Sequence, residues 1–218
     1  MAQLFHPRAD AFLKIVVVGG LGLIFLLIVA SVKLYNSGYY TRVGVPIEQP
    51  VPFSHQHHVS GLGIDCRYCH NTVEQADFAG MPATHTCMSC HSQIWVTSDM
   101  LKPVRASYQT DRPIHWQRVT KLPDFVFFNH GIHVQNGVAC ETCHGRIDEM
   151  PLTWKAHNMT MGWCLNCHRD PARYIRPRNA VFAMGWSPPG DQHTLGARLV
   201  KEYNIPVGRL TDCSTCHR

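Results

Sequence analysis

The sequence predicts a mostly irregular fold in which short α-helices pack around covalently bound groups, behind one N-terminal transmembrane helix. Three observations predict it. All ten cysteines of the 218-residue chain lie in Cys-x-x-Cys-His motifs, an uncharged apolar run lies near the start, and the motifs are arranged in a repeat. A chain of this length that surrounds several large groups has little material left for a separate protein core, so we expect long irregular connections.

The five motifs share one pattern of two cysteines, two intervening residues and a histidine directly after the second cysteine. Such a run is typical of a c-type haem site, where both thiols bond to the haem and the histidine ligates its iron. The sequence therefore predicts a multihaem c-type cytochrome with five covalently bound haem c groups. The predicted attachment residues are Cys66, Cys69, Cys87, Cys90, Cys140, Cys143, Cys164, Cys167, Cys213 and Cys216. The predicted proximal ligands are His70, His91, His144, His168 and His217.

Two other uses of paired cysteines are disfavoured. A disulfide framework suits a cysteine-rich secreted chain, but it gives no reason for a histidine after every pair. Zinc sites also use Cys-x-x-Cys units, yet an odd number of pairs divides badly into sites of four cysteines.

The apolar run Ile15–Val32 contains no charge and is bracketed by Lys14 and Lys33. Its length meets the lower limit for a transmembrane helix. A cleaved signal peptide has a similar plan but a shorter apolar core. We therefore expect an uncleaved anchor over residues 1–34, with the transmembrane helix at about 12–34.

Basic residues flank the predicted helix about equally on both sides, so charge hardly decides its orientation. Covalent haem attachment decides it instead, because haem c is attached outside the cytoplasm. We expect residues 35–218 to form a periplasmic pentahaem domain on a single-pass protein of the bacterial inner membrane.

The soluble part contains a repeat of two dihaem units, at 53–91 and 128–168. Each unit reads F-x-H-x-x-H-V, haem motif, Met-Pro, haem motif. The fifth motif stands apart in a C-terminal haem segment, 170–218, and we expect its haem-free stretch to wrap the surface or meet a partner.

The repeated H-x-x-H element supplies the candidate distal ligands, since a spacing of three puts both imidazoles on one helical turn. The two imidazoles can then face two different haems. The candidates are His55, His58, His130 and His133. His57 has no counterpart in the second unit, where Ile132 stands, and is not expected to be a ligand.

Four distal histidines leave one iron without a sixth ligand. Met150 is the favoured candidate, because methionine is an established axial ligand that raises the reduction potential. Methionine also fills irregular apolar gaps, so the choice stays open. The competing residues are Met81, Met159, Met161, His115 and His157.

Lys and Arg exceed Asp and Glu by 20 to 15, giving a formal charge of +5. Two propionates on each haem would offset this excess, and no basic run supports nucleic-acid binding. We find no acid–base pair, nucleophile elbow or phosphate loop, so no catalytic residue is predicted.

The chain resembles the pentahaem cytochrome c subunit of bacterial alternative complex III, a quinol:electron acceptor oxidoreductase. The resemblance rests on the single anchor, the five motifs and the segments LPDFVFFNHGIHV and MTMGWCLNCHR. The F-x-H-x-x-H-V element is also similar to that of c3-type multihaem cytochromes.

This resemblance implies an electron-transfer subunit that accepts electrons from the integral-membrane quinol-binding subunits through an iron–sulfur subunit. It would pass them to a mono-haem cytochrome subunit, a soluble carrier or a terminal oxidase. The alternative is a NapC/NrfH-type quinol dehydrogenase that oxidises quinol itself. Those proteins carry their first motif close behind the anchor, whereas Val32 and Cys66 are far apart here. A multihaem reductase is disfavoured because all five motifs end in histidine.

Overall fold

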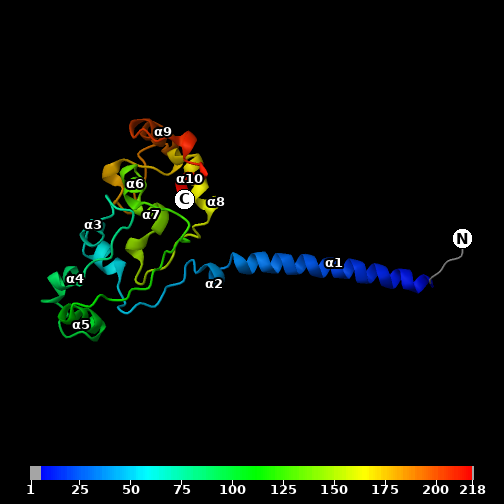
Figure 1. The fold of residues 1–218 in the computed structure, drawn as a ribbon, viewed down its shortest axis with the longest axis horizontal. Coiled ribbons are helices and arrows are strands. Elements are labelled where there is room, and N and C mark those ends of the chain that lie inside the picture. Colours follow the sequence, from blue (N-terminus) through cyan, green and yellow to red (C-terminus); the bar gives the residue numbers. More distant parts are fainter. Residues whose placement is uncertain (1–5, 218) are drawn as a thin grey trace. The chain divides into compact units, whose positions relative to one another are not determined.

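The structure is a computed structural model that describes residues 6–217, so the first five residues of the predicted anchor lie outside the described part. The chain divides into two compact units, Met1–Val43 and Gly44–Arg218, and each is described by itself. Figure 1 shows one long helix in the first unit and many short helices joined by irregular chain in the second.

The first unit is dominated by helix α1, Pro7–Tyr35, which is longer than the predicted 12–34. The extension has a local cause: Nδ1 of His6 accepts a hydrogen bond from the Arg8 backbone N–H at 3.2 Å, and proline occupies the start of the helix. Proline is favoured there because its fixed φ suits a first helical turn. One turn, α2 (Gly38–Thr41), follows.

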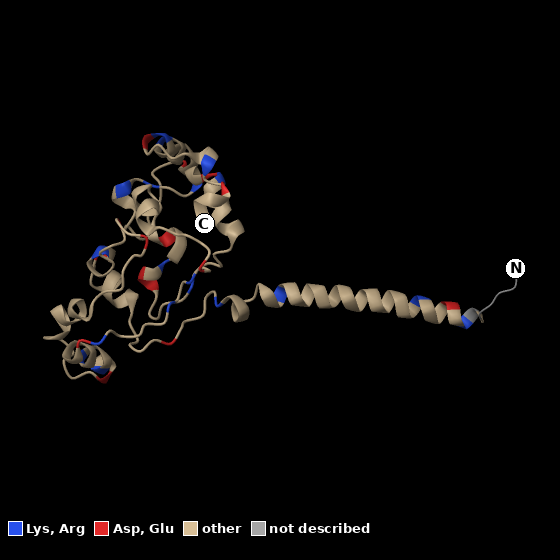
Figure 2. Cartoon of the chain, viewed as in Figure 1, with Lys and Arg blue, Asp and Glu red and all other residues tan. Residues whose placement is uncertain are grey.

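Helix α1 is long and apolar enough to cross a membrane. Its charged residues lie at its two ends, as Figure 2 shows, and Lys14 pairs with Asp10 at 2.8 Å. The large side chains between the two charged ends of the helix are exposed Val, Leu, Ile and Phe. The candidate span Arg8–Tyr35, of 28 residues, is about 42 Å long, more than the roughly 30 Å of a hydrocarbon core. These properties support membrane anchoring.

The second unit is built from short helices and turns, and its described residues form no strand beyond two isolated bridges, Pro46–Trp154 and Val138–Ile175. The predicted fold class is thereby confirmed. The α-helices are α3 (Cys66–Cys69), α4 (Thr84–His91), α5 (Lys102–Thr110), α6 (His130–Gln135), α7 (Cys140–His144), α8 (Met161–Arg169), α9 (Gln192–Glu202) and α10 (Cys213–Cys216). The tighter or wider turns are η1 (Gln56–Gly61), η2 (Asp99–Leu101), η3 (Ile147–Glu149), η4 (Pro171–Arg173), η5 (Arg178–Ala180) and η6 (Val207–Arg209).

Buried apolar side chains form two small clusters instead of one core. The first consists of Val51, Leu101 and Val104, and the second of Val73, Val134 and Val181. Such small clusters cannot by themselves stabilise a unit of this size. The interior therefore needs further apolar material, which haem would supply.

The C-terminal stretch differs from the expected surface wrap. Ile175 and Val181 are each only 1% exposed, and the guanidinium-bearing Arg176 is 5% exposed. This part of the stretch is buried, and its backbone is held near the third motif because the Arg176 N–H donates to the Gly137 carbonyl at 2.9 Å.

Gly196 gives a stability test of the contact between α9 and η4. A Cβ at Gly196 would lie 1.8 Å from the Ala172 carbonyl oxygen, so the two backbones must separate in Gly196→Ala. We expect a loss of about 1–3 kcal/mol of unfolding free energy, measured by thermal or denaturant unfolding. Gly190→Ala is the matched control, since nothing lies within 4 Å of its Cβ position. Equal stability of the two variants would contradict this packing.

Candidate haem-binding site

Each motif is a short helix or the end of one, which fixes the direction of its thiols. Residues three apart share one face of a helix, so both cysteines of a motif point to the same side and the next histidine follows them. Local capping sets the start of these turns. Asp65 Oδ1 accepts the Arg67 N–H at 2.8 Å ahead of α3, and Thr160 Oγ1 accepts the Trp163 N–H at 3.3 Å ahead of α8.

Four of the five motif histidines use Nδ1 in the same way. In each, Nδ1–H donates to a backbone carbonyl, which leaves Nε2 as the bare nitrogen that can ligate a metal. The bonds are His70–Gly80 at 2.8 Å, His91–Ile94 at 3.3 Å, His168–Leu210 at 2.8 Å and His217–Phe125 at 3.1 Å. The fifth, His144, is held in place by burial, which lowers the pKa of its imidazole to about 4.

Nδ1 of each candidate distal histidine is also held, by a backbone carbonyl in three of them and by a hydroxyl group in His55. Their Nδ1 atoms contact Thr153 Oγ1 (His55, 3.0 Å), the Ser54 carbonyl (His58, 2.8 Å), the Asp77 carbonyl (His130, 2.8 Å) and the Asn129 carbonyl (His133, 2.7 Å). Burial also lowers the pKa of His55 to about 4 and lowers that of His133. Neutral imidazole is the form that binds a metal.

Phenylalanine of the F-x-H-x-x-H-V element positions both histidines, a role that the sequence pattern contains but does not explain. Phe53 stacks on His58 with ring centres 4.5 Å apart and meets His55 edge-on at 5.0 Å. Phe128 repeats this geometry with His133 at 4.5 Å and His130 at 4.7 Å. The two units of the repeat are thus alike in side-chain geometry.

Three distal candidates face three motif histidines. The ring centres are 6.2 Å apart for His58 and His91, 6.5 Å for His130 and His144, and 6.1 Å for His133 and His168. Two imidazoles that share one metal at about 2 Å from each nitrogen have ring centres about 6 Å apart. The spacing fits one iron between each pair, and Nδ1 is occupied by a hydrogen bond in five of the six imidazoles, His144 excepted.

The other two motif histidines have no such ring pair among the described residues. His55 lies close enough to His70 for that imidazole to lower its pKa, which makes it the candidate opposite His70. His217 stacks with Phe125 at 5.9 Å. Met150 is 2% exposed, and its Cε lies 4.0 Å from the Cβ position of Gly145, directly after the third motif. Its role as a ligand stays a prediction.

The remaining histidines and methionines lack the Nδ1–carbonyl arrangement or lie at the surface. His57 stacks with Trp95, His157 with Trp163, and the Nε2 atom of His193 contacts Asp170 at 3.3 Å. Met81 and Met161 are largely exposed, Met159 is half-buried, and His115 is exposed.

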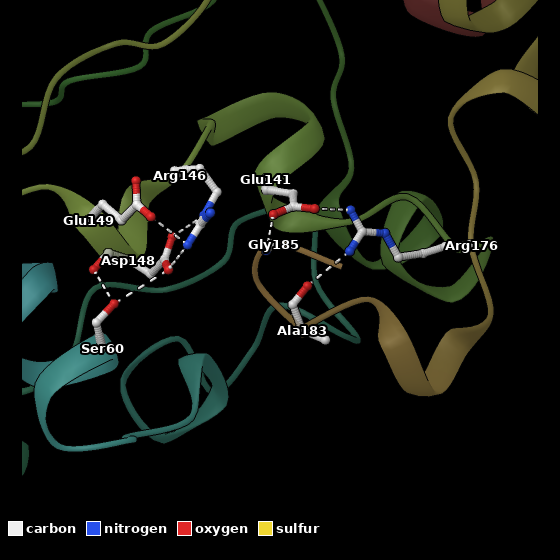
Figure 3. A network of polar contacts seen from close by, with 8 residues as sticks. All are labelled: Ser60, Glu141, Arg146, Asp148, Glu149, Arg176, Ala183 and Gly185. Atoms are coloured by element: carbon white, nitrogen blue, oxygen red, sulfur yellow. Dashed lines mark hydrogen bonds and ion pairs between the residues drawn. The ribbon is translucent and has the colours of Figure 1, made fainter. Parts of the chain in front are cut away.

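Two ion-pair networks hold the segment around the third motif (Figure 3). Arg176 pairs with Glu141, which lies between the two cysteines of that motif, and donates to the Ala183 carbonyl at 2.9 Å. Arg146 binds Asp148 through two hydrogen bonds of 2.9 and 2.8 Å. Ser60 Oγ donates to the Asp148 carbonyl at 2.6 Å, so this network joins η1 to η3.

The residues present fit haem c. Paired thiols lie beside histidines with bare Nε2 atoms, and opposing imidazoles have the spacing for one iron. Bound haem c would supply reversible one-electron chemistry. The chain would hold it through the ten cysteines and orient the iron ligands through carbonyl-anchored imidazoles.

Comparisons with known proteins agree with this site. Residues 126–218 match the family model described as cytochrome c7 and related cytochrome c. The chain is 37% identical over 126 residues to the menaquinone reductase multiheme cytochrome c subunit of Nitratidesulfovibrio vulgaris, covering 57% of this chain and 53% of that protein. It is 35% identical over 65 residues to cytochrome c-552 of Desulfotalea psychrophila, covering 27% of this chain and 13% of that protein.

The chain thus spans about half the length of the first relative and a smaller part of the second. Both relatives are cytochromes, and the family match covers the third, fourth and fifth motifs. Together with the site geometry, these findings show a cytochrome c7-like domain over residues 126–218 and support a multihaem c-type cytochrome of electron transport.

Proposed function

We propose that the chain is a membrane-anchored pentahaem subunit that carries electrons between a quinone-active membrane complex and a second redox protein. The observation that carries the proposal is the set of three facing imidazole pairs, each 6.1–6.5 Å apart between ring centres. With an imidazole on each side, an iron bound at these sites would keep no open position for a substrate, which suits electron transfer.

Five haems follow if every motif is loaded, with His58, His130 and His133 opposite His91, His144 and His168. His55 would serve His70, and Met150 remains our candidate for the fifth iron. Helix α1 would anchor the chain in the bacterial inner membrane, with the haem domain on the periplasmic side.

The partners follow from the resemblance to alternative complex III. We propose integral-membrane quinol-binding subunits and an iron–sulfur subunit on the donor side. A mono-haem cytochrome subunit, a soluble carrier or a terminal oxidase would accept the electrons.

The opposite direction is a second candidate, favoured by one finding. The relative from Nitratidesulfovibrio vulgaris is a subunit of a menaquinone reductase, so in that complex menaquinone is the species reduced. A chain built on the same plan can pass electrons toward the quinone when its donor is the stronger reductant.

Purification from native membranes tests the proposal. Haem stain and pyridine haemochrome should give five haems per chain, and a menaquinol analogue should reduce them only while the membrane subunits remain bound. Reduction of the isolated chain by the quinol would instead support the self-sufficient quinol dehydrogenase. Midpoint potentials mostly above the menaquinone couple would favour quinol oxidation, and potentials below it would favour menaquinone reduction.

A further inference from the structure

The first and second motifs are direct neighbours in space. Tyr68 of the first motif and Ser89 of the second hydrogen-bond through their hydroxyls at 2.8 Å. Each lies between the two cysteines of its motif. His58 of the H-x-x-H element 55–58 faces His91 of the second motif.

The first motif also lies close to the third, although 69 residues, the whole second motif among them, separate the two in the sequence. The Arg67 guanidinium of the first motif lies over the Phe182 ring at 4.5 Å, and the carbonyl of the preceding Val181 accepts the Cys140 N–H at 3.4 Å. His130, which faces His144, also donates from Nδ1 to the carbonyl of Asp77, seven residues after the first motif, at 2.8 Å. The first motif therefore lies between the second and the third.

The third, fourth and fifth motifs follow in chain order. Helix α6 carries His130 and His133, which face His144 of the third motif and His168 of the fourth. His168 Nδ1 donates to the carbonyl of Leu210, just ahead of the fifth motif, at 2.8 Å.

Exposure marks the two ends of this series independently. Of the ten cysteine side chains, Cys90 and Cys213 are exposed and the others are partly buried. They belong to the second and the fifth motif. Among the described residues, no hydrogen bond or ring contact joins the second motif to the third, fourth or fifth.

We propose that the five attachment sites form one unbranched series in space, in the order second, first, third, fourth, fifth. This inference rests on the proposed function, in that each motif holds a haem. The second and fifth sites are then the two exposed ends at which a redox donor and a redox acceptor reach the domain. If the sites were instead arranged in space in their sequence order, the first site and not the second would lie at an end.

The order is tested in the full-length protein by counting, for a chosen haem, how many other haems lie close enough to respond to its charge. The charge on one iron shifts the midpoint potential of nearby irons and acts weakly on distant ones. His58→Met raises the potential of the second site, and His130→Met does so at the third. In redox titrations followed by electron paramagnetic resonance, His58→Met should shift the midpoint potential of one haem besides the haem at the altered site. His130→Met should shift the midpoint potentials of two haems besides the haem at the altered site.

If His58→Met shifted the midpoint potentials of two other haems, the proposed series would be wrong, because the second site would then have two neighbours and lie inside the series. If His130→Met shifted the midpoint potential of only one other haem, the proposed series would also be wrong, because the third site would then lie at an end. Where His58→Met does not keep five haems, His58→Lys retains a nitrogen donor and serves the same count. His193→Met is the control and should shift no midpoint potential, since His193 contacts Asp170 at the surface. Fewer than five haems in the unaltered chain would contradict the proposed function itself.

Discussion

Replacing Cys140 and Cys143 with serine is expected to remove one haem and to destabilise the haem domain far more than the same change at Cys213 and Cys216. The reason is burial. Burial raises the pKa of the Cys143 thiol to about 12. Met150, 2% exposed, lies against the end of this motif. A haem lost from here would leave a cavity in the middle of the second unit.

The expected cost at the third motif exceeds the roughly 2–5 kcal/mol of deleting one large aliphatic side chain, because haem is several times larger. At the fifth motif, Cys213 is exposed, and we expect the domain to fold with four haems. Mass spectrometry of bound haem and thermal unfolding followed by absorbance measure both effects. Comparable unfolding temperatures for the two double variants would show that the third site is not the structural centre.

Much of the site could be predicted from sequence because its covalent chemistry is local. Each attachment unit spans five adjacent residues, and the F-x-H-x-x-H-V element keeps Phe128, His130 and His133 within one short segment. The long apolar helix is equally local, although its N-terminal end also depends on the cap at His6.

The partners of His55 and His130 could not be predicted, because they lie on segments far apart in the sequence. His55 contacts Thr153 and His130 contacts the Asp77 carbonyl, across 98 and 53 residues. No periodicity encodes such contacts. The fifth distal ligand was left open for the same reason, since several methionines and histidines share the required chemistry and only packing distinguishes them.

Arg176 was also beyond prediction, since a basic residue in a Pro- and Arg-rich stretch is normally exposed. Its side chain is 7% exposed and that of its partner Glu141 is 15% exposed. The guanidinium also lies 5.0 Å from the ring centre of Trp186. Glu141 in turn accepts the Gly185 N–H at 2.6 Å, so one ion pair fastens the C-terminal stretch to the third motif.

Arg176→Met is therefore expected to cost about 3–5 kcal/mol of unfolding free energy, because it leaves Glu141 buried without its partner. Arg173→Met is the matched control, since Arg173 pairs with Asp170 at 2.6 Å with its own side chain 69% exposed. A surface pair of this kind contributes about 1 kcal/mol or less. Denaturant unfolding of both variants measures the difference.

A second comparison separates the ion pair from simple packing. Glu141→Leu combined with Arg176→Met removes both charges, so this double variant should be more stable than Arg176→Met alone. Arg176→Lys should recover only part of the loss, because an ammonium cannot match the several directed hydrogen bonds of the guanidinium. If Arg176→Met were as stable as Arg173→Met, the stretch after the fourth motif would not be held by this pair.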